Sequence, residues 1–234
     1  MIATAISTRI SVGLEEGHDA AVWVHALNVP GCAVSGASAE EALASFPEAL
    51  ADWLDFLAAS GAAVPSFEEE IEIAVDEWIR TDAAVGTGES HACFEADLLP
   101  LSAAEIEQGV QRLGDLRGQL LPYVRRLPDA ELDRPRAGGW TVRRILDELA
   151  RAQWWTLTRL GASPLAEVPE RIVGRLDTAM ALVVQQFTTL PPEARESVLE
   201  LDGELWTPRK VLRRLLWLEW SLGRAALELL GTDS

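Results

Sequence analysis

Histidine and cysteine, the side chains that most often bind zinc and nickel, are rare in this chain. The chain has three histidines, His18, His25 and His91, and two cysteines, Cys32 and Cys93. Neither His18 nor His25 has a partner at metal-ligand spacing, and two cysteines are too few for a four-sulfur zinc site or a disulfide framework. No histidine follows His91. Because imidazole is the usual nitrogen ligand of nickel and zinc, the second half lacks the ligand type that these metals most often use.

Sequence motifs of other enzyme classes are also missing. The chain has no Walker loop, no dinucleotide-binding glycine motif and no His-Glu-x-x-His helix. The Gly-x-Ser-x-Gly elbow of hydrolases is absent from Val34–Ser38 and from the region around Ser221. Cys32 follows a Pro-Gly turn and has no His/Asp pair spaced to activate it, so we interpret it as a packed side chain.

Charge divides the chain into two parts. The net charge is −17, but residues 1–100 hold 18 acidic and two basic side chains, whereas residues 101–234 hold 19 acidic and 18 basic ones. This abrupt change in charge near residue 100 predicts an acidic domain over 1–100 and a nearly neutral domain over 101–234. The acidic part argues against direct nucleic-acid binding, which depends on Lys and Arg. A basic protein partner fits this charge, although net charge also serves solubility.

Membrane and export signals are not visible in the sequence. No run of 18 apolar residues predicts a membrane helix. The first nine residues lack the basic region and apolar core of a signal peptide. We therefore expect a cytoplasmic protein with no membrane partner.

The apolar pattern of residues 1–100 predicts a sheet with one long helix. Glu15–Asp19 is expected to be a hairpin loop. Ser38 and Glu41 form a capping box that begins a helix ending near Ala59. The expected strands are Ile6–Val12, Ala20–Leu27, Cys32–Val34, Glu68–Ile79 and His91–Leu98.

The run Trp23–Leu43 resembles the HicB-like antitoxin domain. It contains a strand, the turn Pro30–Cys32, a glycine at Gly36, the cap Ser38 and the sequence Glu41–Leu43. The resemblance implies a partial ribonuclease-H-like β-β-β-α fold without nuclease activity. It also implies that the chain neutralises a small basic toxin and carries a DNA-binding segment, and no such segment is visible here.

Residues 101–234 have the periodicity of four long helices, which is typical of a bundle. The second and fourth begin alike, since Trp140–Leu149 and Trp206–Leu215 share a Trp-Thr start, basic residues and apolar positions. We expect Thr141 and Thr207 to cap these helices. Structure alone explains the repeat. The expected helices are Ser102–Arg126, Val142–Leu160, Pro169–Leu190 and Pro208–Leu230.

This second half resembles the DinB/YfiT-like superfamily through Gly138–Val142 and Glu219–Arg224. The resemblance implies an up-down four-helix bundle, within an α+β protein. It further implies a nickel or zinc site of three histidines that serves transferases, isomerases or hydrolases. The matching positions in this chain are Glu148, Trp217 and Ser221, and none is a histidine. We therefore predict a degenerate metal site with no metal or other cofactor.

The space around these positions is the candidate pocket. Its tryptophans either fill the former metal position or form the wall of an apolar ligand pocket. Glu148 has either a raised pKa or an arginine partner such as Arg151 or Arg214. A metal site made of Asp147, Glu148 and Glu219 is an alternative, because carboxylates on facing helices hold metals in some bundles. The candidate pocket residues are Glu148, Trp154, Trp217, Glu219, Trp220 and Ser221, with Trp155 as a neighbour.

Basic residues gather in the first turns of the two related helices. They form either a patch for phosphate or an acidic surface, or a surface that docks the acidic first half in the same chain or in a homodimer. They are Arg143, Arg144, Arg209, Lys210, Arg213 and Arg214.

Three hypotheses of function remain open from the sequence. The first is a non-catalytic protein that binds a small-molecule ligand or a protein partner. The second is a DinB-type metal-dependent hydrolase or transferase with carboxylate ligands. The third is a HicB-like antitoxin or regulator, which predicts a small basic toxin as its partner.

Overall fold

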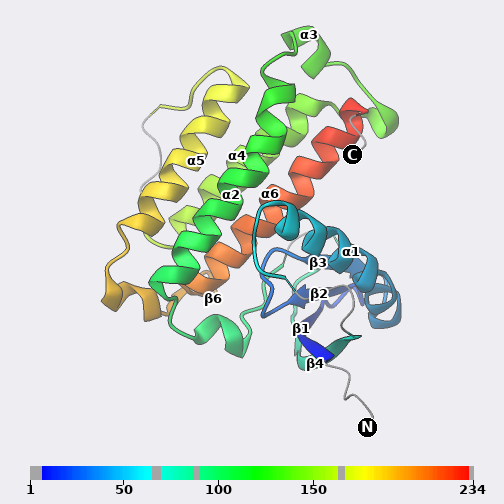
Figure 1. The fold of residues 1–234 in the computed structure, drawn as a ribbon, viewed down its shortest axis with the longest axis vertical. Coiled ribbons are helices and arrows are strands. Elements are labelled where there is room, and N and C mark those ends of the chain that lie inside the picture. The colour runs from blue at the N-terminus through cyan, green and yellow to red at the C-terminus, as the bar shows by residue number, and fades with distance from the viewer. Residues whose placement is uncertain (1–6, 65–69, 87–89, 163–166, 232–234) are drawn as a thin grey trace. The chain divides into compact units, whose positions relative to one another are not determined.

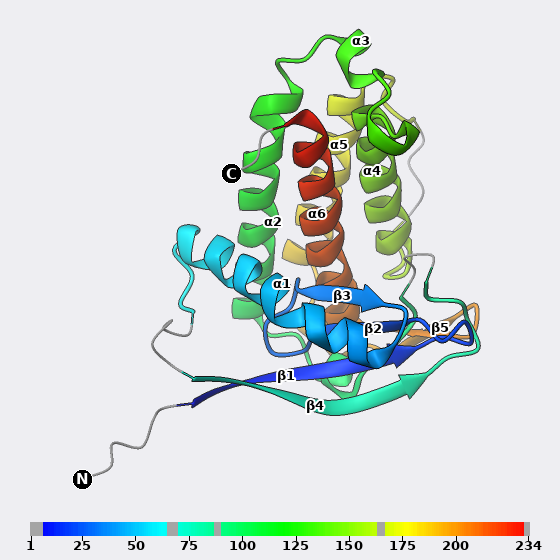
Figure 2. The ribbon, with the colours of Figure 1, turned by 90° about the vertical axis from the view of Figure 1, so that its right-hand side faces the viewer.

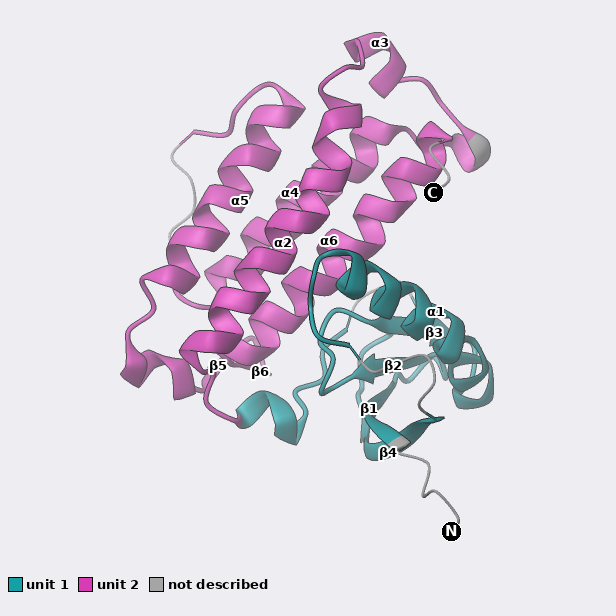
Figure 3. Ribbon diagram, viewed as in Figure 1, with its two compact units in different colours: residues 1–98 teal, residues 99–234 magenta. Residues whose placement is uncertain are grey.

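The computed structural model describes residues 7–64, 70–86, 90–162 and 167–231 and divides into two compact units, residues 1–98 and 99–234 (Figure 3). The first unit holds a mixed sheet and one long helix, and the second is mainly helical. The predicted α+β class is therefore confirmed. Within the described residues, no helix is both long enough and apolar enough to cross a membrane.

A four-stranded sheet with one covering helix forms the first unit (Figure 2). The strand order is β3-β2-β1-β4, with β1 antiparallel to β2 and parallel to β4. Helix α1 packs on β2 and β3 through an apolar stripe that includes Phe46, Leu50 and Trp53. The Ser38 hydroxyl caps this helix by accepting the Glu41 N–H. The elements are β1 (Ser7–Glu16), β2 (Val22–Ala26), β3 (Ala33–Gly36), α1 (Ala39–Ala59), β4 (Glu70–Arg80) and the 3-10 helix η1 (Glu95–Leu98).

Two predictions for this unit are wrong. Glu15 and Glu16 belong to β1, opposite Trp23 and Val22, so the hairpin turn is shorter than predicted. Residues 91–98 are not a strand, because side chains rather than a neighbouring strand accept their N–H groups. The Glu15 carboxylate accepts two of these N–H groups, and Asp97 accepts the N–H of Phe94. The predicted strand ends at Ile6 and Glu68 lie outside the described residues.

Four long helices form the second unit (Figure 1). Helices α2 and α4 each pack against both α5 and α6, and their apolar faces form the core. Thr141 and Thr207 cap α4 and α6, as predicted, by accepting the N–H groups of Arg144 and Lys210. The helices are α2 (Ala103–Val124), α3 (Asp129–Leu132), α4 (Val142–Thr158), α5 (Ile172–Thr188) and α6 (Pro208–Leu230), with the 3-10 helices η2 (Ala137–Gly139) and η3 (Pro192–Glu196).

The order of helix directions differs from the predicted up-down bundle. Figure 1 shows α2 and α6 running in one direction and α4 and α5 in the other, so the consecutive helices α4 and α5 are parallel. Residues 159–171 connect them, and a chain of this length extends to about 40 Å, more than the roughly 25 Å of a 17-residue helix. The connection is therefore long enough to return to the starting end of the bundle.

A short hairpin precedes α6, which the sequence analysis did not predict. Strands β5 (Leu199–Leu201) and β6 (Glu204–Trp206) are antiparallel and are joined at Asp202 and Gly203. Both turn residues have positive φ, which suits the Asp-Gly pair of a tight hairpin. The hairpin buries Trp206 completely, whereas Trp140 at the start of α4 is half-exposed. The two tryptophans that match in the sequence repeat therefore lie in different structural environments.

Candidate functional site

The strongest polar cluster of the second unit lies inside the bundle. The Arg117 side chain of α2 donates from Nε and Nη2 to the two carboxylate oxygens of Glu219 on α6, at 2.6 and 2.7 Å. Gln153 of α4 accepts from Arg117 Nη2 at 3.0 Å and donates to Glu219 Oε2 at 2.6 Å. Arg117 Nη1 donates to the Leu176 carbonyl of α5 at 2.8 Å. This buried triad, as we call Arg117, Gln153 and Glu219, thus connects all four helices.

The side chains of the buried triad are almost completely shielded from solvent. Arg117, Gln153 and Glu219 are 4%, 0% and 1% exposed. A paired arginine and carboxylate neutralise each other, and bidentate geometry gives the strongest form of this contact. The Gln153 amide forms one hydrogen bond with Arg117 and another with Glu219. Glu219 was a candidate from the sequence, whereas Arg117 and Gln153 were not, since nothing local indicates that residues 102 positions apart meet.

The other two carboxylates of the hypothetical metal site are also held by arginines. Glu148 accepts from Arg151 Nη2 at 2.6 and 2.7 Å, and Asp147 accepts from Arg175 Nη1 at 2.7 Å. Among the residues that the structure describes, no group of three His, Cys, Asp or Glu side chains could hold a metal ion. A carboxylate already bound to a guanidinium is a poor metal ligand, because the cation replaces an existing ion pair.

The predicted pocket residues do not share one cavity. Glu148 lines a shallow polar depression of about 300 Å³ at the start of α4, together with Thr141, Arg143, Arg144, Asp147 and Arg151. Neither Trp217 nor Ser221 lines it. Glu219 belongs to the buried triad. Within the described residues, the Ser221 hydroxyl and the Trp154 indole N–H are buried without a hydrogen-bond partner.

The tryptophans contact cationic side chains. Trp155 packs edge-on against Trp206, with ring centroids 5.5 Å apart. The Arg159 guanidinium lies 4.4 Å from the Trp155 ring, and the Lys210 ammonium lies 4.4 Å from the Trp206 ring. Trp220 lies near Arg224, at 4.9 Å. These aromatic–cation contacts occupy ring faces that an apolar ligand would need.

The basic residues predicted to form a patch have partners within the bundle. Arg143 binds Asp129 and Asp133, and the Arg144 guanidinium lies over the Trp140 ring. The Lys210 ammonium is fully buried and binds Glu204 and the Leu205 carbonyl. These contacts reduce the charge available to a phosphate or acidic partner.

Arg209, also predicted to belong to the basic patch, instead links two helices of the bundle. It binds the Glu105 carboxylate and donates to the carbonyls of Leu99 and Pro100. Its hydrogen bond lowers the pKa of Glu105 to about 2. Arg209 therefore ties the start of α6 to the start of α2 and to the chain before it.

A second polar cluster lies in the first unit and was not predicted. Glu15 of β1 is fully buried and accepts from the Ser90 hydroxyl at 2.7 Å and from the N–H groups of His91 and Ala92 at 2.6 and 3.0 Å. The Nε2 atom of His25 on β2 lies 3.5 Å from Glu15 and 3.4 Å from the Ser90 hydroxyl. Burial raises the pKa of Glu15, but the hydrogen bond and charge of His25, with the Ser90 and His91 hydrogen bonds, bring it down to about 2.

This cluster is not a nucleophilic triad. In such a triad the carboxylate and the serine contact opposite nitrogens of the imidazole, whereas here both lie at Nε2 of His25. Ser90 also donates to Glu15 rather than to the histidine. The nearby Cys32 thiol is buried, and its burial and the charge of Asp52 raise its pKa to about 12, so it is a packed side chain.

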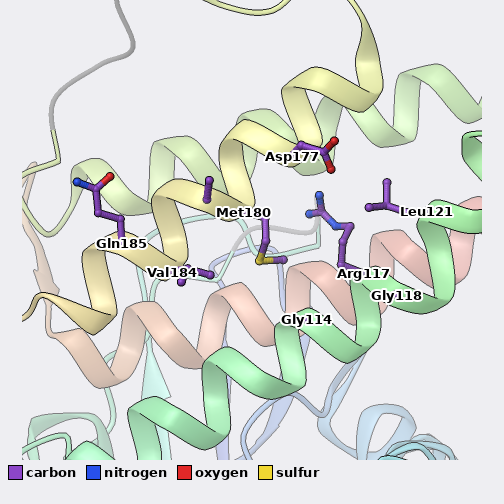
Figure 4. A pocket seen from close by; sticks show the side chains of 9 residues that line it. Gly114, Arg117, Gly118, Leu121, Asp177, Met180, Val184 and Gln185 are labelled. Carbon is purple, nitrogen blue, oxygen red and sulfur yellow. The ribbon is translucent and has the colours of Figure 1, made fainter.

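An open groove lies between α2 and α5 (Figure 4). Its volume is about 600 Å³, and its lining is mostly apolar. Gly114 and Gly118 lie one turn apart on α2, and a Cβ atom at either would meet no other group within 4 Å. The groove is lined by Gly114, Arg117, Gly118, Leu121, Asp177, Met180, Ala181, Val184 and Gln185.

Comparison with solved structures finds similarity to helix-bundle proteins. No protein-family model matches the chain, and no curated protein matches it. The solved structure of TT2238, described as a four-helix bundle protein, is 22% identical over 55% of this chain and 99% of TT2238, with a TM-score of 0.42. YfiT from Bacillus subtilis, described as a probable metal-dependent hydrolase with an unusual four-helix bundle topology, is 19% identical over 62% of this chain and 95% of YfiT, with a TM-score of 0.46. Neither similarity assigns an activity to this chain.

Proposed function

We propose that this chain is a non-catalytic binding protein whose second unit is a bundle of the DinB/YfiT type with a degenerate metal site. One observation carries the proposal: Asp147, Glu148 and Glu219, the carboxylates of the alternative metal site, are each bound to a different arginine. The carboxylates that would have to bind a metal are therefore already paired with arginines.

The residues at the three matching positions do not fit nickel or zinc. Trp217 has no usable lone pair, Ser221 is a weak ligand, and Glu148 is committed to Arg151. Helices α4 and α6, which carry these positions, pack against each other, and residues 217 and 221 are four apart on one face of α6. This packing supports the proposal of a metal site that has lost its donor atoms. The antitoxin hypothesis stays a prediction from the sequence resemblance.

Metal binding to tag-free protein tests this proposal. We expect wild-type protein to bind far less than one nickel or zinc ion per chain, by elemental analysis and by calorimetric titration. The variant Glu148→His/Trp217→His/Ser221→His restores three imidazoles, and we expect it to bind about one nickel ion per chain.

Two controls make the result decisive. The variant Arg143→His/Arg144→His/Arg151→His places three histidines on α4 alone and should not gain the site. Stoichiometric metal in the wild type that is lost in Glu148→Gln would refute the proposal and indicate a carboxylate metal site instead. A folded restored variant that binds no nickel would refute a bundle of this type.

A further inference from the structure

The groove between α2 and α5 has an apolar surface beside a buried cation. Leu121, Met180 and Val184 supply apolar contacts, while Gly114 and Gly118 leave space along α2. In Figure 4 the Arg117 side chain extends from α2 towards α5, between Asp177 and Met180. A volume of about 600 Å³ lies within the range of small-molecule sites.

Arg117 retains one donor that the protein does not use. A guanidinium has five N–H groups. Four are used: by the two oxygens of Glu219, by the Gln153 amide oxygen and by the Leu176 carbonyl. The fifth belongs to Nη1 and has no acceptor among the described residues, although Arg117 is only 4% exposed. A buried donor without an acceptor is energetically unfavourable, so a ligand acceptor there is favoured.

The charged groups around Arg117 favour a neutral hydrogen-bond acceptor over an anion. Glu219 already neutralises Arg117, and Asp177 adds a carboxylate to the groove that is itself paired with Arg125 at 3.2 Å. A second anion beside Arg117 would not be neutralised, because Glu219 already balances the charge of Arg117. The carboxylate of Asp177 would also repel it. A neutral carbonyl oxygen accepts the remaining hydrogen bond without this repulsion.

We propose that this groove binds a neutral, elongated apolar molecule with one carbonyl oxygen, such as a ketone, ester or amide. The carbonyl accepts from Nη1 of Arg117, and the apolar body lies along Gly114, Gly118 and Val184. This proposal rests on the proposed binding function and names its ligand class. Substitution of Arg117 alone is unsuitable for a test, because it would leave Glu219 buried without its charged partner and destabilise the bundle.

A neutral fluorescent ketone, 6-propionyl-2-dimethylaminonaphthalene, is the probe for this test. We expect wild-type protein to bind one probe per chain with a blue-shifted emission. The variant Gly118→Leu fills the groove and should weaken binding about tenfold or more, whereas Gly118→Ala adds only one methyl group and should stay within about twofold. Both substitutions favour the helix, so α2 is retained.

The carbonyl is tested separately with 2-dimethylaminonaphthalene, which lacks it. We expect the wild type to bind this analogue about tenfold more weakly, as loss of a hydrogen bond to a charged donor predicts. Equal affinity for the two compounds would refute the role of Arg117. Failure of the probe to bind, or a dimer in analytical ultracentrifugation that Gly118→Leu dissociates, would refute the ligand site. None of these outcomes depends on the metal measurements, so the proposed function and this site can fail separately.

Discussion

Replacing Glu219 with alanine is expected to lower the free energy of unfolding by about 3–5 kcal/mol, the largest effect of any single substitution in the bundle that we predict. Arg117 would keep its positive charge in the interior, with only the Gln153 and Leu176 oxygens as acceptors. A buried charge without its partner is far more costly than the pair is stabilising. Urea denaturation of the full chain, followed by helical circular dichroism, measures the change.

Two controls separate charge burial from loss of volume. Glu148→Ala removes a half-exposed carboxylate whose Arg151 partner is also exposed, and it should change the free energy of unfolding by no more than about 0.5 kcal/mol. The variant Arg117→Met/Gln153→Leu/Glu219→Leu replaces the buried triad with apolar side chains and should be close to neutral or stabilising. If Glu219→Ala is as mild as Glu148→Ala, the ion pair is not buried in solution.

This pattern of stabilities bears on the proposed function. A metal centre needs donors that are free to leave their partners. The side chains of the buried triad instead form five described hydrogen bonds that connect four helices, and removing a single member is costly. A stable apolar replacement would show that the bundle needs neither metal nor charge at its centre. The interior would then be a scaffold for a surface groove.

Local signals explain what the sequence analysis predicted correctly. The four helices of the bundle follow from apolar periodicity, and the caps Thr141 and Thr207 follow from side chains that accept N–H groups three residues on. Such signals need no knowledge of the rest of the chain. They fix helix positions to within about three residues but not the helix directions, since the parallel pair α4 and α5 depends on how a long connection is routed.

Nonlocal contacts explain what the sequence analysis missed. Glu15 meets Ser90 and His91 across more than 70 residues, and a glutamate at the end of a strand normally indicates a loop or surface position. Glu219 was selected on its position, yet its partner Arg117 has no motif that marks it as buried. The groove had only a weak sequence indication, the pair Gly114 and Gly118. Two such glycines are equally compatible with an exposed helix face that has no groove.

The first unit is expected to lose stability steeply in acid because of Glu15. Its pKa is about 2 in the folded chain and 4.5 is its ordinary value, so ionised Glu15 favours the folded state above about pH 4.5. That contribution, about 3 kcal/mol in full, is lost as the pH falls from about 4.5 towards 2. Urea titrations at pH 7, 4 and 3 measure the loss, with the indole N–H resonance of Trp23, which donates to the Val85 carbonyl, as the reporter of this unit.

Substitution at Glu15 distinguishes this carboxylate from all others that titrate in the same range. Glu15→Gln keeps the shape and cannot titrate, so we expect lower stability at pH 7 and a shallower loss between pH 4.5 and 3 than in the wild type. The neighbouring Glu16→Gln is the matched control, since that side chain lies on the same strand but at the surface beside Arg80. Parallel acid curves for wild type and Glu15→Gln would mean that other groups carry the acid sensitivity. A shallower curve in Glu15→Gln alone assigns it to the contact that joins β1 to the segment around Ser90.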